Sequence, residues 1–412
     1  MKTDIPVKRV VIIGGAYYGN RGAALMLKNS IKKIRESVDC HVVFDVWAEH
    51  IQENRKLCDD SGVNFIEFVP WKFALLVVPS LFFSLFFKGS LSNRSGSPHS
   101  LLGSCRRADL FFDISGISFL DERKPIFLLY DTLIALPAIW LDKPIIKAAQ
   151  ALGPFCNSLN RKLATVILPR ITWVYARGAE SLENLKKLGL RNVGLAADVG
   201  FFEAASSYCE EMTLLKSLRK PIIGISVSSV VYEKCQKMGI DYVKVTNEFI
   251  RYLIDHLKCS VIIIPHAVRN GESMRNNDVP VINKILENST SENVHYFKHI
   301  VHPYELRTLI SGCDFLLASR FHAMISSLSV GVPVIILGWS HKYQEVLEMF
   351  DLPDCFITYN ELNAQAVIRL FEKLFPQREI LAAKINSKID EVRKLSDLNF
   401  HAIPGLLNVS GS

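Results

Sequence analysis

Arg320 and His322 carry the clearest signal for chemistry in this 412-residue sequence. They follow the apolar run FLLAS, where a buried strand is expected to end and a helix to begin. Ligands of open α/β sheets bind beyond the carboxyl ends of the strands. A guanidinium matches carboxylate or phosphate, and an imidazole can hold or release a proton near neutral pH. The pair predicts an anion site beside a group that can exchange a proton. The alternative is a loop-capping arginine beside a satisfied core histidine.

A glycine-rich turn after the first apolar run is the second candidate. Glycines allow close approach of the backbone, and the N–H groups of a following helix attract anions or polar ligands. The turn is neither a P-loop nor the dinucleotide fingerprint, so a plain strand-to-helix turn is an equal alternative. The candidate acceptor or loop residues are Gly15, Gly19, Asn20, Arg21 and Gly22.

Four further polar residues stand at expected strand ends. Arg177 follows the run 173–176 and precedes Ser181 by one helical turn, although a lone arginine ordinarily makes a surface salt bridge. The others, each weak alone, are His266, Asp198 and Lys342. The sequence contains no H-E-x-x-H motif, paired Cys/His cluster or calcium loop, so we expect no metal.

The elements that would position these residues alternate between short β-branched runs and amphipathic stretches. This alternation is typical of parallel βαβ units and predicts two α/β lobes. A polar connection over 203–220 separates them. The expected divisions are an N-terminal Rossmann-like lobe over 1–205, a C-terminal Rossmann-like lobe over 218–385, and a helical tail over 386–412. The runs are 9–13, 23–36, 40–46, 221–227, 260–264, 315–318 and 332–337.

Composition and charge narrow the class of protein. The chain is 49% hydrophobic and 22% charged, as in globular proteins, and its net charge of +7 is too small to indicate nucleic-acid binding. Nine scattered cysteines without a C-x-x-C pair indicate reduced thiols. No secretory signal precedes the first apolar run. We therefore expect a cytoplasmic protein.

One segment departs from this ordinary composition. Residues 73–87 (FALLVVPSLFFSLFF) contain no charge, and Pro79 interrupts them. They are too short to span a bilayer, so they form either an interfacial element or a buried helix. Arg106 and Arg107 follow downstream, and basic residues attract anionic headgroups. That charge favours peripheral contact with the inner face of the membrane.

Several motifs together resemble the polysaccharide pyruvyltransferase family. The resemblance extends from Val10 to about Leu352, and its most specific part is the Ser-Arg-Phe-His block with the later Gly-Val-Pro and Lys342. Many members have an aspartate where this chain has Ala23, and an all-glycine turn where it has 115–118. The motifs are YYGNRGAALML, AAQALGPF, the segment from Arg177 to Ser181, AADVGF and SRFHAMISSLSVGVPVIIL.

The resemblance implies two Rossmann-like lobes, similar to the GT-B glycosyltransferases, and a phosphoenolpyruvate donor. Pyruvate would pass to a sugar of a polysaccharide or its lipid-linked precursor as a ketal, with no cofactor and no nucleic acid. The implied roles are catalysis by His322 and donor binding by Arg177, Arg320, Lys342 and His266; Asp198 joins the acceptor or loop group. The alternatives are a GT-B enzyme using a nucleotide-sugar, and a non-catalytic, membrane-associated assembly factor.

Overall fold

The chain forms two compact units in the computed structural model, which describes residues 6–86, 100–202, 211–271, 276–289, 291–297 and 302–408. Unit 1 comprises 1–18, 26–199 and 394–412, and unit 2 comprises 19–25 and 200–393. The units meet along the chain at Val199 and Gly200, rather than in the expected connection over 203–220. Residues 386–393, expected in the tail, belong to unit 2, and the loop residues 19–25 do as well.

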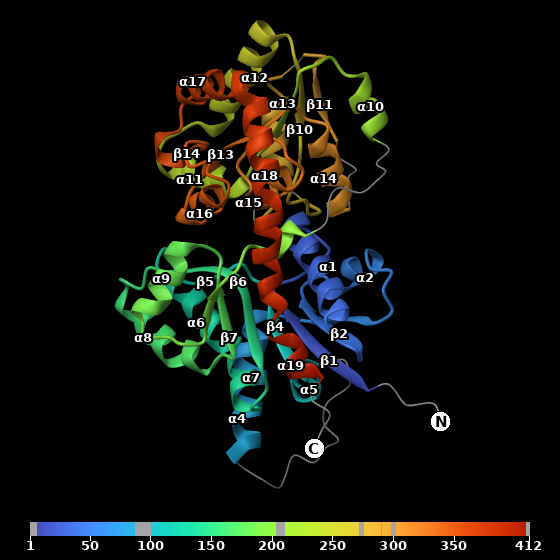
Figure 1. Ribbon diagram of the computed structural model, residues 1–412, viewed down its shortest axis with the longest axis vertical. Helices are drawn as coiled ribbons and strands as arrows, with labels where there is room; N and C mark the ends of the chain where they lie inside the picture. Colours follow the sequence, from blue (N-terminus) through green and yellow to red (C-terminus); the bar gives the residue numbers. More distant parts are fainter. Residues whose placement is uncertain are drawn as a thin grey trace. The chain divides into compact units, whose positions relative to one another are not determined.

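Unit 1 is built on a parallel sheet in the order β3-β2-β1-β4-β6-β7-β8, with β5 paired to β6. Its strands are mostly apolar on both faces, as expected where helices cover both sides. In Figure 1, α1 and α2 lie beside β1 and β2, and α8 and α9 lie near β6 and β7. The strands are β1 Val7–Ile13, β2 His41–Ala48, β3 Val63–Glu67, β4 Leu110–Asp113, β5 Ile117–Leu120, β6 Ile145–Gly153, β7 Trp173–Ala176 and β8 Val193–Leu195.

The helices of unit 1 pack on this sheet mainly through aliphatic and aromatic side chains. They are α1 Arg21–Glu36, whose first turn belongs to unit 2, α2 Ile51–Lys56, α3 Pro70–Lys72, a π-helix Phe73–Val77, α4 Val78–Phe86, α5 Leu101–Arg107, α6 Pro125–Leu133, α7 Leu136–Trp140, α8 Ser158–Ile167, α9 Ala179–Lys187 and α19 Ile403–Leu407.

Unit 2 has its own parallel sheet in the order β11-β10-β9-β12-β13-β14. Its strands are β9 Ile222–Ser226, β10 Ser260–Ile263, β11 Val294–Tyr296, β12 Phe315–Ala318, β13 Val334–Gly338 and β14 Phe356–Thr358. Both sheets are parallel and connected through helices, so the predicted fold class of two Rossmann-like lobes is confirmed.

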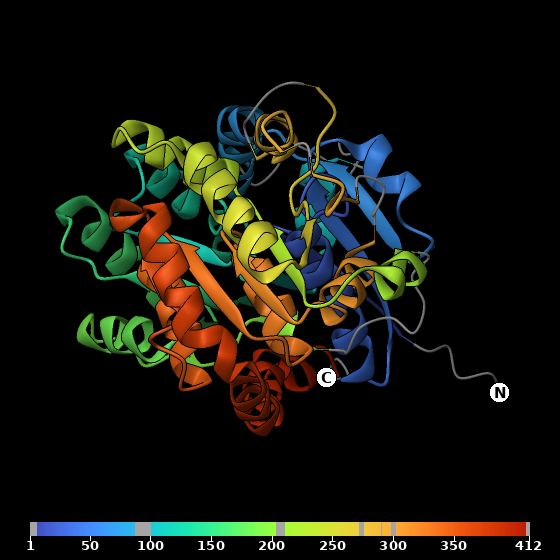
Figure 2. The ribbon, with the colours of Figure 1, turned by 90° about the horizontal axis from the view of Figure 1, so that it is seen from above.

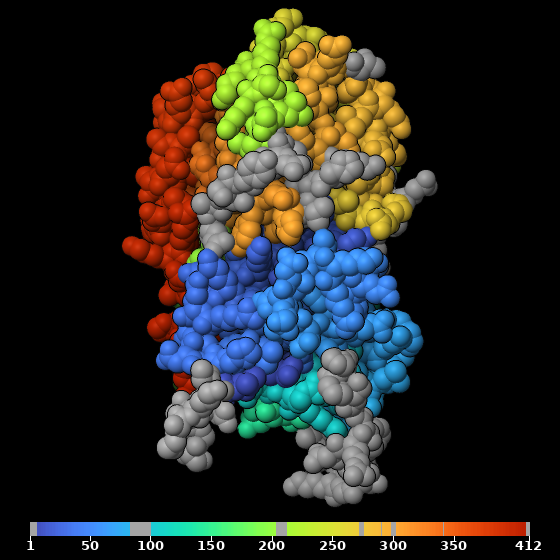
Figure 3. All heavy atoms as spheres, turned by 90° about the vertical axis from the view of Figure 1, so that its right-hand side faces the viewer, coloured from blue at the N-terminus to red at the C-terminus, as the bar shows by residue number. Residues whose placement is uncertain are grey.

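Two helices of unit 2, α12 and α17, lie side by side in Figure 2. They contact each other through the rings of Phe249 and Phe371, whose centroids are 5.4 Å apart. Helix α10, yellow-green on the surface in Figure 3, contacts α14. Helix α10 occupies part of the expected polar connection, whose residues 203–210 lie outside the described residues. The helices are α10 Glu211–Ser217, α11 Ser229–Lys237, α12 Tyr242–Leu257, α13 Val279–Leu286, α14 Pro303–Ser311, α15 Phe321–Ser329, α16 His341–Met349, α17 Ala364–Leu374 and α18 Arg378–Asp397, whose last residues belong to unit 1.

The apolar segment 73–87 folds into the π-helix and α4, and Phe87 lies outside the described residues. Phe73, Val78 and Leu81 are buried, whereas Leu75 and Leu76 are exposed. The segment is therefore neither fully buried nor free of the core. Among the described residues, no helix is long and apolar enough to cross a membrane.

Candidate functional site

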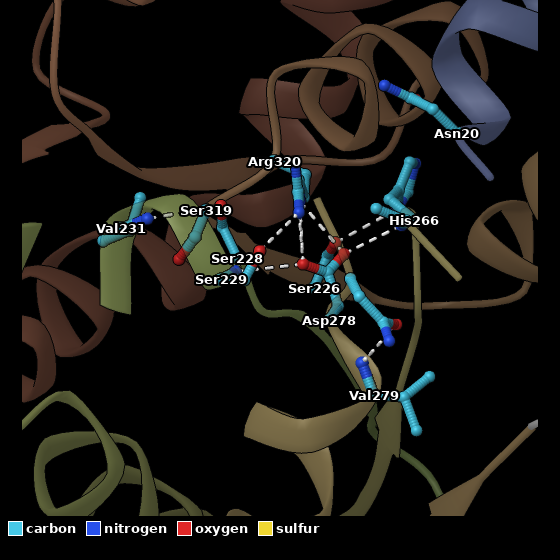
Figure 4. Close-up of polar contacts among 12 residues, drawn as sticks. Asn20, Ser226, Ser228, Ser229, Val231, His266, Asp278, Val279, Ser319 and Arg320 are labelled. Carbon is cyan, nitrogen blue, oxygen red and sulfur yellow. Dashed lines mark hydrogen bonds and ion pairs between the residues drawn. The ribbon is translucent and has the colours of Figure 1, made fainter. Parts of the chain in front are cut away.

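The first turn of α15 places Arg320 at the carboxyl end of β12. Arg320 is the N-cap residue, in extended backbone conformation, and Ser319 separates it from the strand. Its Nε lies 3.0 Å from each carboxylate oxygen of Asp278, and its Nη2 donates to Ser229 Oγ at 3.0 Å and to Asp278. Figure 4 shows the guanidinium directed at these two residues. Arg320 is thus held by a carboxylate on one edge of its fork.

Asp278 is the buried centre of this arrangement. Its Oδ1 accepts from the Ser229 N–H at 3.0 Å, and its Oδ2 accepts from the Ala267 N–H at 2.8 Å. Asp278 is the N-cap residue of α13, yet its side chain caps nothing there because it turns towards Arg320. The carboxylate therefore connects the ends of β9, β10 and β12. The Nη1 group of Arg320 takes no part in the bonds above and can meet an anionic ligand.

His266 lies beside this centre, after β10. Its Nδ1 is 3.1 Å from Ser226 Oγ, and only 2% of the residue is exposed. Burial lowers the pKa of His266 well below the ordinary value, and the positive groups of His322, Arg320 and Arg21 lower it further. We expect a neutral imidazole at physiological pH, which binds an anion through hydrogen bonds rather than charge.

Stability should depend on pH through His266. An unfolded histidine gains a proton below about pH 6.5, whereas buried His266 stays neutral to lower pH. The unfolded state then binds more protons, so the free energy of unfolding should fall as pH drops below about 6.5. Urea unfolding between about pH 7.5 and 5 measures this slope. His266→Gln should reduce it, and His256→Gln, at an exposed position, should not; equal slopes in all three proteins would contradict the assignment.

Residues 19–22 of the glycine turn lie next to His266 and form part of unit 2. The Arg21 N–H donates to the His266 carbonyl at 2.9 Å, and the Val268 N–H donates to the Gly19 carbonyl at 3.0 Å. Asn20 Oδ1 accepts from the Gly22 N–H at 2.9 Å and so caps α1. Asn20 therefore orders the turn, and Arg21 is buried within it.

His322 occupies the space that a side chain at position 22 would need. A Cβ at Gly22 would lie 2.2 Å from Cγ and Nδ1 of His322, a distance that real contacts never show. The ring of His322 also meets that of Phe321 edge-on, with centroids 5.3 Å apart. The His322 ring can therefore lie here only because residue 22 is a glycine.

Gly22→Ala should displace the His322 ring. Overpacking costs about 1–3 kcal/mol, against a helix-propensity gain of about 1 kcal/mol, so we expect modest destabilisation and a clear loss of kcat. Thermal unfolding and steady-state kinetics measure the two effects. Gly405→Ala is the matched control, because a Cβ at that helical glycine would meet nothing within 4 Å. Wild-type kcat in Gly22→Ala would show that the ring position is unimportant.

Lys342 lies in the first turn of α16, among aromatic rings. Its Nζ is 4.6 Å from the ring centroid of Trp339, 5.1 Å from Tyr343 and 5.2 Å from Phe321. The residue is only 7% exposed. Aromatic faces stabilise a desolvated ammonium. Since Phe321 precedes His322, Lys342 belongs to the same neighbourhood as the α15 residues.

Sequence reasoning missed Asp278, Ser229 and Tyr242. The Tyr242 hydroxyl lies 2.8 Å from Ser319 Oγ and is fully buried, which raises its pKa. Asp278 precedes Val-Pro at the start of a helix. This pattern predicts that the aspartate caps the helix, and it gives no sign that the carboxylate binds an arginine. Nothing local marks Ser229 or Tyr242, because their contacts join residues far apart in the chain.

Arg177 and Asp198 form a buried ion pair in unit 1. Arg177 Nη1 lies 2.9 Å from Asp198 Oδ2, and a Cβ at Gly116 would lie 3.4 Å from the same nitrogen. Asp198 is fully buried, so its carboxylate positions Arg177. Ser181 has a structural contact, since its Oγ accepts from the Leu152 N–H at 3.3 Å. Gly15 packs against Leu27 and Ile114.

A second buried pair in unit 1 was not predicted. Lys147 Nζ lies 2.5 Å from Asp113 Oδ2, and both side chains are 1% exposed. Burial on its own would raise the pKa of Asp113, but Lys147 and Ser115 outweigh it and hold the pKa below its usual value. A lysine and Gln150 in the otherwise apolar strand IIKAAQALG were the available signal.

The structure thus divides the predicted residues between the units. Unit 1 holds Gly15, Arg177 and Asp198. Unit 2 contains residues 19–22 of the glycine turn together with His266, Arg320, His322 and Lys342. Across the described part of the chain, no three His, Cys, Asp or Glu residues are grouped to hold a metal ion.

Comparison with known proteins identifies relatives in sequence. The model of the polysaccharide pyruvyl transferase family matches residues 20–341. The amylovoran biosynthesis protein AmsJ of Erwinia amylovora is 18% identical over 413 residues, which cover 94% of this chain and 97% of that protein.

Solved structures share the fold. A putative UDP-N-acetylglucosamine 2-epimerase from Listeria monocytogenes aligns with a TM-score of 0.62 at 11% identity, covering 97% of this chain and 96% of its own. MnaA of S. aureus, solved with UDP, aligns with a TM-score of 0.61 at 14% identity, covering 98% and 99%. At such identities the likeness concerns the fold alone, and it confirms the predicted GT-B-like class.

Proposed function

The chain belongs to the polysaccharide pyruvyl transferase family, and from this premise we propose that it transfers pyruvate from phosphoenolpyruvate to a sugar, forming a pyruvate ketal. Family membership makes the protein a transferase of polysaccharide biosynthesis. The donor, the ketal product and a lipid-linked acceptor are parts of the proposal. The observation that carries it is Arg320, fixed by Asp278 at the start of α15, two residues from His322.

The chemistry of the donor fits this set of residues. Phosphoenolpyruvate carries a carboxylate and a phosphate, which guanidinium and ammonium groups bind. In unit 2, Arg320 and Lys342 supply the positive charge, and the N–H groups at the start of α15 add the positive end of a helix. Neutral His266 adds a hydrogen bond. Arg177, held by Asp198 in unit 1, is our further candidate for a donor-binding cation.

His322 is the proposed general acid. It protonates the methylene carbon of phosphoenolpyruvate, which leaves an oxocarbenium-like centre at C2 for one sugar hydroxyl to attack with loss of its proton. The bond from C2 to the phosphate oxygen then breaks, phosphate leaves with the electron pair, and a second hydroxyl closes the ketal. Of the two protons that the hydroxyls release, one replaces the proton given by His322, and the other goes to the departing phosphate. The alternative role of His322 is phosphate binding alone.

Two rivals differ in donor use. A GT-B glycosyltransferase would bind a nucleotide-sugar, and an assembly factor would bind neither donor. The similar S. aureus structure was solved with UDP. That ligand is a property of the S. aureus protein, and it is the reason to titrate nucleotide-sugars as well as phosphoenolpyruvate. Membership of a pyruvyl transferase family favours phosphoenolpyruvate over both rivals.

Calorimetric titration with phosphoenolpyruvate, and separately with nucleotide-sugars, tests the proposal. We expect phosphoenolpyruvate to bind, and Arg320→Lys to weaken binding at least about tenfold, because lysine cannot hold Asp278 with one edge and present another to the donor. Exposed Arg251→Lys on α12 is the matched control and should bind normally. Binding of a nucleotide-sugar instead would overturn the proposal, and unchanged affinity in Arg320→Lys would make Arg320 structural.

A further inference from the structure

Unit 1 exposes a row of large apolar side chains on one short stretch of chain. Trp71 is 61% exposed, Leu75 67%, Leu76 59% and Phe82 45%. We call these four residues the apolar face. Phe73, Val78 and Leu81, on the opposite side of the same stretch, are buried in the core of the unit. The stretch is thus anchored from behind, and its exposed residues are held in place.

The backbone explains why two adjacent leucines share this face. Pro79 has no N–H to donate to the Leu75 carbonyl, so the regular α-helical bond is lost there. The chain adopts a π-helix over Phe73–Val77 before α4 begins. A π-turn contains more residues than an α-turn, which lets Leu75 and Leu76 both point outward while Phe73 and Val78 point inward.

A groove beside the apolar face has mainly aliphatic walls. Its volume is about 330 Å³, and it lies between the π-helix and the start of α5. Its polar groups are Lys72, Glu67 and two serines, and its apolar lining comes from Val69, Leu76, Val77, Leu101 and Leu102. Such a groove suits a hydrocarbon chain with an anionic head.

The charged residues that line the groove are Lys72 and Glu67. Lys72 Nζ lies 5.8 Å above the ring of Trp71, and its ion pair with Glu67 is long, at 3.9 Å, and exposed. Arg106 and Arg107 lie in the last turn of α5, whose first residues line the groove, and Arg107 pairs with buried Asp45 at 3.8 Å. Tryptophan and lysine side by side, with an apolar body and a polar tip, are typical of a membrane interface.

We propose that the apolar face of unit 1 docks on the surface of an anionic lipid bilayer, with Lys72 at the headgroups. Apolar burial together with positive charge is what peripheral attachment requires. The inference does not depend on the identity of the donor.

Vesicle co-sedimentation of the full chain tests this docking. The probes are phosphatidylcholine mixed with phosphatidylglycerol, and phosphatidylcholine alone. Leu75→Glu/Leu76→Glu should lower partitioning onto the anionic vesicles at least about tenfold. The matched control, Leu159→Glu/Val166→Glu, adds the same charge at exposed apolar positions of α8 in the same unit and should bind as the native chain. Lys72→Gln should weaken binding only to the anionic vesicles.

Three results would contradict docking on a membrane. Failure of the native chain to bind anionic vesicles, or equal loss in the two double variants, would overturn the proposal. A dimer that dissociates in Leu75→Glu/Leu76→Glu, without vesicle binding, would assign the face to self-association instead. Thermal unfolding verifies that the variants fold, and their affinity for phosphoenolpyruvate reports on the donor site separately.

Discussion

Replacing His322 by alanine is expected to lower kcat by about a hundredfold to ten-thousandfold, the range for loss of a general acid. The proposed reaction requires a proton on the methylene carbon, and His322 stands two residues after the fixed Arg320. The fold should survive, because the ring fills the space beside Gly22 and its removal opens room there without introducing a clash. Phosphate release under saturating phosphoenolpyruvate and acceptor measures the effect.

The size of the loss and the donor affinity together separate the two roles of His322. As a general acid, the residue should leave phosphoenolpyruvate binding nearly intact in the alanine variant, whereas a phosphate ligand should change affinity and kcat/KM together. His256→Ala, at an exposed position of α12, is the matched histidine control. Near-normal kcat in His322→Ala would remove the residue from the mechanism.

Replacing Asp278 by alanine is expected to have the largest effect on stability. The substitution strands the Arg320 guanidinium, which is mostly buried, and removes the acceptor of the Ser229 and Ala267 N–H groups. Removing one partner of a buried pair costs about 3–5 kcal/mol. We expect a loss of that size in the free energy of unfolding, measured in urea, together with loss of phosphoenolpyruvate binding.

An exposed ion pair supplies the control for Asp278. Glu183 and Lys187 on α9 lie 3.0 Å apart with both side chains more than half exposed, so Glu183→Ala should cost about 0.5 kcal/mol or less. Asp278→Asn keeps the shape of the side chain and one acceptor oxygen. Its loss in free energy of unfolding should lie between those of Asp278→Ala and Glu183→Ala. A loss below about 1 kcal/mol in Asp278→Ala would mean that Arg320 is held by other contacts.

The fold was predictable because its signals are local. Buried parallel strands are short β-branched runs, and 315–318 and 173–176 were predicted with the bounds that β12 and β7 have. The assignment of residues 19–25 to unit 2 was not predictable. It depends on bonds between Arg21 or Gly19 and residues near 266–268, and no local pattern encodes such pairing.

The candidate site was predictable only in part, for a similar reason. Arg320, His322, His266 and Lys342 follow strands, and strand ends of a parallel sheet converge. Asp278 and Asp198 decide how the arginines are held, yet their partners are 42 and 21 residues away. The spacing of residues along the sequence does not reveal which distant arginine a buried carboxylate will bind.

The apolar segment shows the limit of composition as a guide. Fifteen uncharged residues left an interfacial and a buried element as alternatives. In the structure one side of the stretch is buried, as at Leu81, and the other side is exposed, as at Leu75. The helical period alone could not assign the sides, because the π-helix shifts them.

The contact between Gly22 and His322 has a consequence for how such sequences diverge. While position 322 holds an imidazole, any side chain at position 22 would enter its volume. A lineage that gave up the histidine would be released from this restriction, and its glycine would then drift towards better helix formers. Descendants that abandoned the chemistry should therefore have lost both residues, in that order, so a retained Gly22 beside an altered position 322 would mark a recent loss.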